Sequence, residues 1–185
     1  MAASGTPATV TVATRRAWLH ATDAQLEAQC QVDRYRASGP GGQHRNKTES
    51  AVRVRHAASG LAAIAEDSRS QGENRTRAVR RLREKIALGV RAPVVVEAFA
   101  PSLALAALVT GGTARLGEKT RQTAGYLEAM AELLDLLVAT GVEIAATAQL
   151  LGASTGATSK LLLHDDRVAS VVNTLRAGRG LRPLR

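Results

Sequence analysis

The sequence predicts an α+β fold in which a small β-α-β-β-α domain precedes an all-helical module with a helix-turn-helix-like pattern. Residues 51–56 alternate between apolar and basic side chains, which is typical of a strand with one solvated face. Apolar residues after Ser70 and again from Leu127 recur at spacings of three and four, which is typical of helices with one buried face. Hydrophobic residues make up 45% of the 185 positions, enough to form a buried core.

The first segment, residues 1–16, is rich in Ala, Thr and Ser, and we expect it to be a flexible leader. It lacks the apolar run of a secretory signal, but its Arg and Ser content leaves an organellar transit peptide open. We therefore expect a cytoplasmic protein, with an organellar matrix as the alternative.

The small domain is expected over residues 17–91. A strand over residues 30–36 should end at the turn-forming run Ser38-Gly39-Pro40-Gly41-Gly42, and a short helix over residues 44–50 should follow. The alternating strand 51–56 then turns at Ser59-Gly60 into a returning strand over residues 61–66.

A long helix closes this domain. Ser70 and Glu73 have the spacing of a capping box, in which a hydroxyl and a carboxylate satisfy the free backbone donors of the first turn. Val79, Leu82 and Ile86 share one face of this helix, and basic side chains occupy most of the remainder.

Residues 92–126 are expected to be a helical connector, and residues 127–185 a helical module. Ala148, Gly152 and Leu161 stand where a helix-turn-helix needs a small residue, a turn glycine and an apolar anchor. The second helix of this motif carries one cation, Lys160, so packing or protein contact is favoured slightly over nucleic-acid binding.

Composition excludes several classes of protein. One cysteine, Cys30, excludes an internal disulfide framework and a multi-cysteine zinc site, and the four histidines show no metal-ligand spacing. We therefore expect neither a metal nor a cofactor. No apolar run approaches the length of about 18 residues that a membrane span requires, so no membrane partner is expected.

Positive charge is concentrated in one stretch. Residues 41–91 carry twelve basic and five acidic residues, a net charge of +7, whereas residues 1–40 and 92–185 carry +1 each. Such a concentration favours a polyanionic partner, because each neutralised phosphate releases condensed counterions. Arginine predominates, which suits forked contacts to phosphate; the alternative is a solvated helix face without a ligand.

The stretch from Arg36 to Arg53, RASGPGGQHRNKTESAVR, carries the strongest motif. Together with Arg69-Ser70-Gln71 and Asn74-Arg75 it resembles the signature of class I peptide-chain release factors, over about residues 30–90. That family hydrolyses the ester between the nascent peptide and tRNA in the peptidyl-transferase centre of the ribosome.

The resemblance implies catalytic roles for Gly41, Gly42 and Gln43. The Gln43 backbone N–H would stabilise the transition state, and its side chain would admit water over larger nucleophiles. The two glycines would allow backbone angles closed to other residues. Gln43 would also be the target of an N5-methyltransferase. The implied partners are large-subunit rRNA and peptidyl-tRNA, and we expect the protein to act as a monomer.

Polar and cationic residues around this motif are expected to contact RNA phosphates, positioning the loop without reading bases. They are Arg36, His44, Arg45, Asn46, Lys47, Arg53, Arg55, Arg69, Arg75, Arg80, Arg81 and Arg83.

About 35 residues precede the motif, fewer than a stop-codon-reading domain needs, so we expect a codon-independent, ribosome-rescue type of factor. Four arginines near the C-terminus, after a helical module, do not match the Lys/Arg-rich tail of that type. The alternative is a non-catalytic, nucleic-acid-binding regulatory protein that uses its helix-turn-helix.

Overall fold

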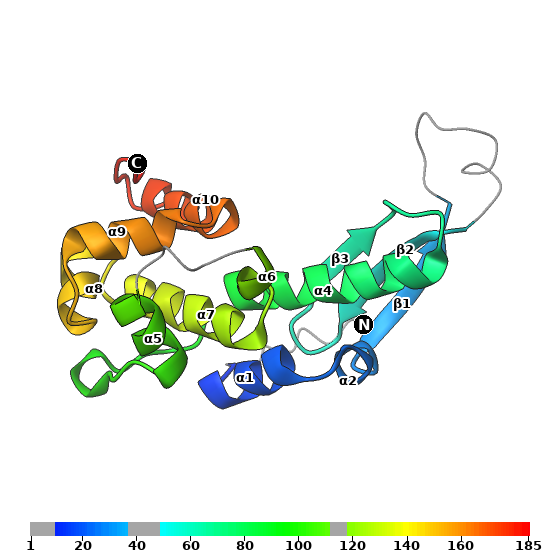
Figure 1. Cartoon of the computed structure of the whole chain (residues 1–185), viewed down its shortest axis with the longest axis horizontal. Helices are drawn as coiled ribbons and strands as arrows, with labels where there is room; N and C mark the ends of the chain where they lie inside the picture. The colour runs from blue at the N-terminus through cyan, green and yellow to red at the C-terminus, as the bar shows by residue number, and fades with distance from the viewer. Residues whose placement is uncertain (1–9, 37–48, 112–117) are drawn as a thin grey trace, which may run out of the picture.

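The computed structural model describes residues 10–36, 49–111 and 118–185 (Figure 1). Three antiparallel strands form a sheet in the order β1 (Cys30–Tyr35), β2 (Ala51–His56) and β3 (Ala62–Ala65). The long helix α4 (Gln71–Gly89) packs against β2 and β3. The predicted strands and the long helix are confirmed, and so is the α+β fold.

The alternating pattern of β2 explains how sheet and helix meet. Val52 and Val54 are fully buried with Val79 and Leu82 of α4, whereas Arg53 and Arg55 lie on the exposed face of the sheet. Helix α4 begins at the expected residue because the Ser70 hydroxyl accepts a hydrogen bond from the Glu73 backbone N–H.

Two short helices precede the sheet, α1 (Val12–His20) and α2 (Asp23–Glu27), and both pack against α4. Helix α1 overlaps the predicted leader, so residues 12–16 belong to the folded part of the chain. Their inclusion has a physical cause, because Arg15 is buried in an ion pair and Trp18 and Leu19 join the hydrophobic core.

The second half of the described chain is helical. Its elements are η1 (Val96–Ala98), α5 (Leu103–Gly111), α6 (Glu118–Arg121), α7 (Ala124–Ala139), α8 (Ile144–Leu150), α9 (Thr155–Leu163) and α10 (Asp166–Ala177). Helix α7 runs through the middle of this half and packs against α4 and α1 as well as α5, α8 and α10 (Figure 1). Buried residues of both halves therefore form one hydrophobic cluster.

The turn between α8 and α9 contains Gly152, whose φ of +64° is left-handed and favours glycine. Ala148 and Leu161 are buried on either side of it. Residues 44–48 of the predicted short helix lie outside the described residues, and its last two, Glu49 and Ser50, are not helical. Among the described residues, no helix combines the length and the apolar character needed to cross a bilayer.

Candidate functional site

The ends of β1 and β2 fix where the chain enters and leaves residues 37–48. Tyr35, the last residue of β1, pairs with Ala51, the first of β2, and the Arg36 guanidinium lies 3.8 Å from the Glu49 carboxylate just beyond. These strand ends lie on the side of the molecule away from α8, α9 and α10 (Figure 1). Gly41, Gly42, Gln43, His44, Arg45, Asn46 and Lys47 lie outside the described residues.

Asn74, in the first turn of α4, joins this strand end to the β3–α4 connection. Its buried side-chain amide donates to the carbonyls of Ser50 (2.7 Å) and Ser68 (2.8 Å), and its Oδ1 accepts from the Ser68 N–H (2.9 Å). Since Ser50 directly precedes β2, the chain between residues 37–48 and β2 is held to the helix. Asn74 was part of the family signature, but its role becomes visible only in the fold.

The predicted RNA-contacting arginines on α4 also make contacts within the protein. Arg75 forms a forked ion pair with Glu27 of α2, and hydrogen bonding from Arg75 holds the pKa of Glu27 below its usual value. Arg83 binds the Asp23 carboxylate at 2.7 Å and the Ala21 carbonyl at 2.8 Å, with its side chain only 12% exposed. These two arginines fasten α2 to α4.

A second group of arginines lies beside the sheet. Arg81 pairs with Asp67 at 2.8 Å and donates to the Ile64 carbonyl on the outer edge of β3. The hydrogen bond from Arg81 keeps the pKa of Asp67 below its ordinary value. On the exposed sheet face, Arg53 pairs at 2.8 Å with Asp33, its partner in the strand register.

Arg55 and Arg69 differ from these. Both are exposed, and within the described parts of the chain neither has a carboxylate within 4 Å. Arg55 extends from the same sheet face as Arg53, and Arg69 follows Ser68, which Asn74 joins to Ser50 at the start of β2. These two guanidinium groups are therefore available to an anion without breaking an ion pair.

The distribution of charge in space differs from its distribution along the sequence. All three acidic residues of positions 1–40, Asp23, Glu27 and Asp33, pair with arginines of the basic stretch. Arg80, for example, lies 3.7 Å from Asp23. A count by segments could not reveal this, because α2 and β1 are brought alongside α4 and β2 only by folding.

No group of three or more His, Cys, Asp and Glu side chains placed to hold a metal occurs among the residues that the structure describes. His56 is buried against Trp18, with ring centroids 4.7 Å apart, and bonds Ser59 through Nδ1 at 2.9 Å. Burial lowers the pKa of His56 and favours the neutral ring, so this histidine links α1 to the β2–β3 turn as a packing residue.

Comparison with known proteins identifies the family of the small domain. Residues 23–94 match the model of the RF-1 domain. A peptide chain release factor 2 of Paramagnetospirillum magneticum is 52% identical over 60 residues, which are 32% of this chain and 16% of that protein. A peptide chain release factor 1 of Geobacter sulfurreducens is 51% identical over 63 residues, 34% of this chain and 18% of that protein.

Residues 23–94 are therefore an RF-1 domain similar to that of peptide chain release factors. The match spans less than a fifth of the length of these curated relatives. It contains α2, the whole sheet, α4 and the motif Gly41-Gly42-Gln43. Residues 23–94 are called the RF-1 domain below, and residues 95–185 the helical part.

Proposed function

We propose that the protein hydrolyses the ester of peptidyl-tRNA on the ribosome and releases the nascent peptide. The observation that carries this proposal is the RF-1 domain match, which contains Gly41-Gly42-Gln43 between two strands that the structure pairs in register. Water is the second reactant, so the products are a peptide with a free carboxylate and a tRNA with a free hydroxyl.

The chemistry requires a positioned water and a donor for the charge that develops on oxygen in the transition state. We assign the donor to the Gln43 backbone N–H and the selection of water to its side-chain amide. Gly41 and Gly42 give the loop the backbone freedom that entry into the peptidyl-transferase centre requires. N5-methylation of Gln43 by a glutamine methyltransferase would occur at this same amide.

The arginines around the motif fall into three groups in this proposal. Arg55 and Arg69 contact rRNA or tRNA phosphates directly, because they are exposed and have no carboxylate partner among the described residues. Arg36, Arg53, Arg80 and Arg81 are partly exposed and can share their guanidinium groups between a carboxylate and a phosphate. Arg75 and Arg83 mainly hold α2 in place.

We further propose that release is independent of a stop codon and serves stalled ribosomes, with the protein acting as a monomer in the compartment of those ribosomes, the cytoplasm. Codon reading would need a surface that reaches the decoding site. In the described helical part, the exposed face of α9 carries one cation, Lys160, which suits packing or protein contact better than reading RNA.

Release of labelled peptide from purified ribosomes tests this proposal. The ribosomes carry peptidyl-tRNA in the P site and either an empty A site on truncated mRNA, a stop codon or a sense codon. We expect release from the empty-A-site complex that a stop codon does not increase. Release only at stop codons would contradict codon independence, and no release from any complex would contradict the hydrolase itself.

The same assay separates the hydrolase from a nucleic-acid-binding regulator. A regulator would bind DNA in a salt-dependent way that survives Gln43→Ala and would leave peptidyl-tRNA intact. A hydrolase releases peptide and loses that activity with the same substitution.

A further inference from the structure

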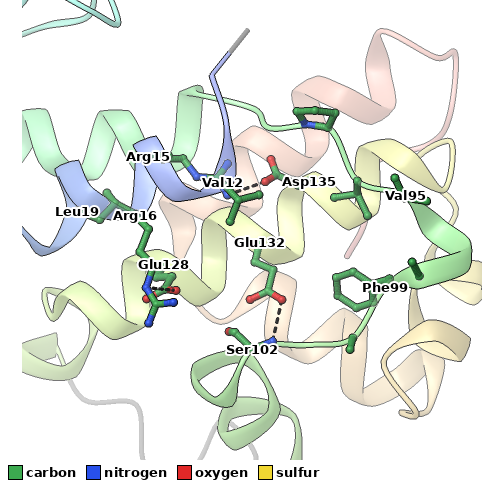
Figure 2. A pocket seen from close by; sticks show the side chains of 14 residues that line it. Val12, Arg15, Arg16, Leu19, Val95, Phe99, Ser102, Glu128, Glu132 and Asp135 are labelled. Carbon is green, nitrogen blue, oxygen red and sulfur yellow. Dashed lines mark hydrogen bonds and ion pairs between the residues drawn. The ribbon is translucent and has the colours of Figure 1, made fainter.

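A hollow of about 370 Å³ lies on the opposite side of α7 from α10, between α1, α7 and residues 93–102 (Figure 2). Its wall is mostly apolar, with Val12 and Leu19 from α1 and Val95 and Phe99 from the connecting segment. None of the arginines of the RF-1 domain described above lines the hollow. Nothing in the proposed hydrolysis uses it.

Three carboxylates of α7 line the hollow, and two of them are neutralised. Asp135 lies 2.6 Å from Arg15 and 3.1 Å from Arg91 and also accepts from the Ala92 N–H at 3.1 Å. Glu128 lies 3.2 Å from Arg16 through one oxygen and 2.6 Å from His20 through the other.

The third carboxylate, Glu132, differs. It accepts one hydrogen bond, from the Ser102 N–H at 2.8 Å, and no cation within the described parts of the chain lies within 4 Å of it. Figure 2 shows its carboxylate in the open part of the hollow, with Val12, Phe99 and the Arg16–Glu128 pair around it. A partly buried carboxylate among apolar side chains is stabilised by a cation that enters the same space.

Two exposed apolar side chains, Val12 and Val95, line the hollow, and a third, Leu103, follows the lining residue Ser102 in the sequence. Val12 is 48% exposed, Val95 68% and Leu103, next to Ser102, 92%. These are three of the four most exposed large hydrophobic side chains among the described residues. Exposed apolar side chains gathered around a concave site are typical of a surface that another molecule covers.

We propose that this hollow receives a lysine or arginine side chain of a partner protein, carried on an apolar segment. The aliphatic part of that side chain would pack between Val12 and Phe99, and its cationic end would pair with Glu132. The flanking apolar residues of the segment would cover Val95 and Leu103. RNA is the wrong partner here, because phosphates would be repelled by Glu132 and offer nothing to these apolar side chains.

The test uses three short peptides in which two leucines flank a central lysine, norleucine or glutamate. Binding is followed through the methyl NMR signals of Val12, Val95 and Leu103 in the full chain. We expect saturable shifts with the lysine peptide, affinity about tenfold or more weaker with norleucine, and no shifts with glutamate. Equal binding of lysine and norleucine peptides would overturn the role of Glu132, and shifts caused by single-stranded RNA would overturn the choice of partner.

Glu132→Gln isolates the charge, because its amide oxygen can still accept from the Ser102 N–H. We expect this variant to bind the lysine peptide about tenfold more weakly and the norleucine peptide as the wild type does. The matched control is Glu143→Gln, which removes an exposed carboxylate at the start of α8 and should change nothing. An equal loss in the control, or no loss with Glu132→Gln, contradicts the proposal.

Leu103→Ala gives a second variant whose folding is not in question, since this side chain is 92% exposed. This substitution should weaken binding of the lysine and norleucine peptides by the same factor, because it removes an apolar contact and leaves the charge of Glu132 in place. No weakening of either peptide would show that Leu103 does not take part.

Discussion

The RF-1 domain and its junction with the helical part use charge in different ways. In the domain, arginines of α4 and β2 pair with carboxylates near the surface. In the pairs Arg53–Asp33 and Arg81–Asp67, for example, the side chains are between 29% and 45% exposed. At the junction, Asp135 of α7 is buried and bound by Arg15 of α1 and by Arg91, which follows α4.

We infer that the buried ion pairs stabilise the fold, whereas the surface ion pairs leave their arginines accessible to another molecule. A surface pair contributes about 1 kcal/mol or less, whereas breaking a buried one leaves a charge without solvent or partner. Burial also lowers the pKa of Arg91 to about 10, although the nearby Asp135 acts in the opposite direction. The junction is therefore expected to be rigid, and the arginines of the domain to be exchangeable between carboxylate and phosphate.

The largest expected effect comes from breaking the junction. Asp135→Ala leaves Arg15, whose side chain is 3% exposed, buried without its partner, and should lower the free energy of unfolding by about 3–5 kcal/mol. The matched change in the domain, Asp33→Ala, should cost less than about 1 kcal/mol. Urea unfolding of both variants measures the difference, and equal losses would remove the distinction between the two regions.

The next effect concerns two asparagines that hold chain segments in place, one in each region. Asn74→Ala removes three hydrogen bonds at a buried site and should cost about 3 kcal/mol. Asn173→Ala, which removes two bonds to the half-buried Leu184 backbone, should cost about 1–2 kcal/mol.

Peptide release distinguishes these two asparagines further. Under conditions where both variants are folded, Asn74→Ala should slow release, because Ser50, between residues 37–48 and β2, is no longer held. Asn173→Ala should release peptide at the wild-type rate. If both variants slow release equally, Asn74 does not act through the segment that carries Gln43.

Removing Arg55 and Arg69, which have no carboxylate partner among the described residues, should change binding without changing stability. Arg55→Gln together with Arg69→Gln should reduce the slope of log affinity against log salt for ribosome binding by about 1.5–2. Lys160→Gln, an exposed cation of the helical part, serves as the control and should leave the slope unchanged. An equal change in the control would place the RNA contact on both regions.

The smallest effect is a pH dependence. The Arg75 hydrogen bond lowers the pKa of Glu27 in the folded protein, so this pair stabilises the fold above the unfolded pKa of about 4.3 and loses that effect as pH falls through the folded value. The stability difference between the wild type and Arg75→Gln should therefore shrink from neutral pH to about pH 3. Arg55→Gln, which removes no carboxylate partner, should show a difference that does not vary with pH. A constant difference for Arg75→Gln would contradict the assignment.

Local patterns predicted the small domain well. The alternation of residues 51–56 and the helix cap at Ser70 each depend only on residues close in the sequence. The strand and the start of α4 could therefore be predicted from neighbouring residues alone. The predicted leader failed at residues 12–16, because helix α1 is held by Asp135, more than a hundred positions away. No local pattern could signal that contact.

The site around Gln43 remains a prediction. The resemblance of its motif to release factors could be identified from the sequence, and the arginines expected to contact RNA followed from a count of charge. Which of those arginines remain unpaired depends on where Asp23, Glu27 and Asp33 lie after folding. The hollow around Glu132 likewise unites α1, α7 and residues 93–102, which no sequence window contains.

We propose that Gly41-Gly42-Gln43 hydrolyses peptidyl-tRNA while the arginines of the RF-1 domain bind the ribosome. Single-turnover release by Gln43→Ala, at a concentration where ribosome binding is saturated, tests it most directly. The exposed Gln149→Ala on α8 provides a matched control. We predict that Gln43→Ala binds as tightly as the wild type but releases peptide at least about a hundredfold more slowly, with the control unaffected. Release at the wild-type rate by Gln43→Ala would contradict the claim.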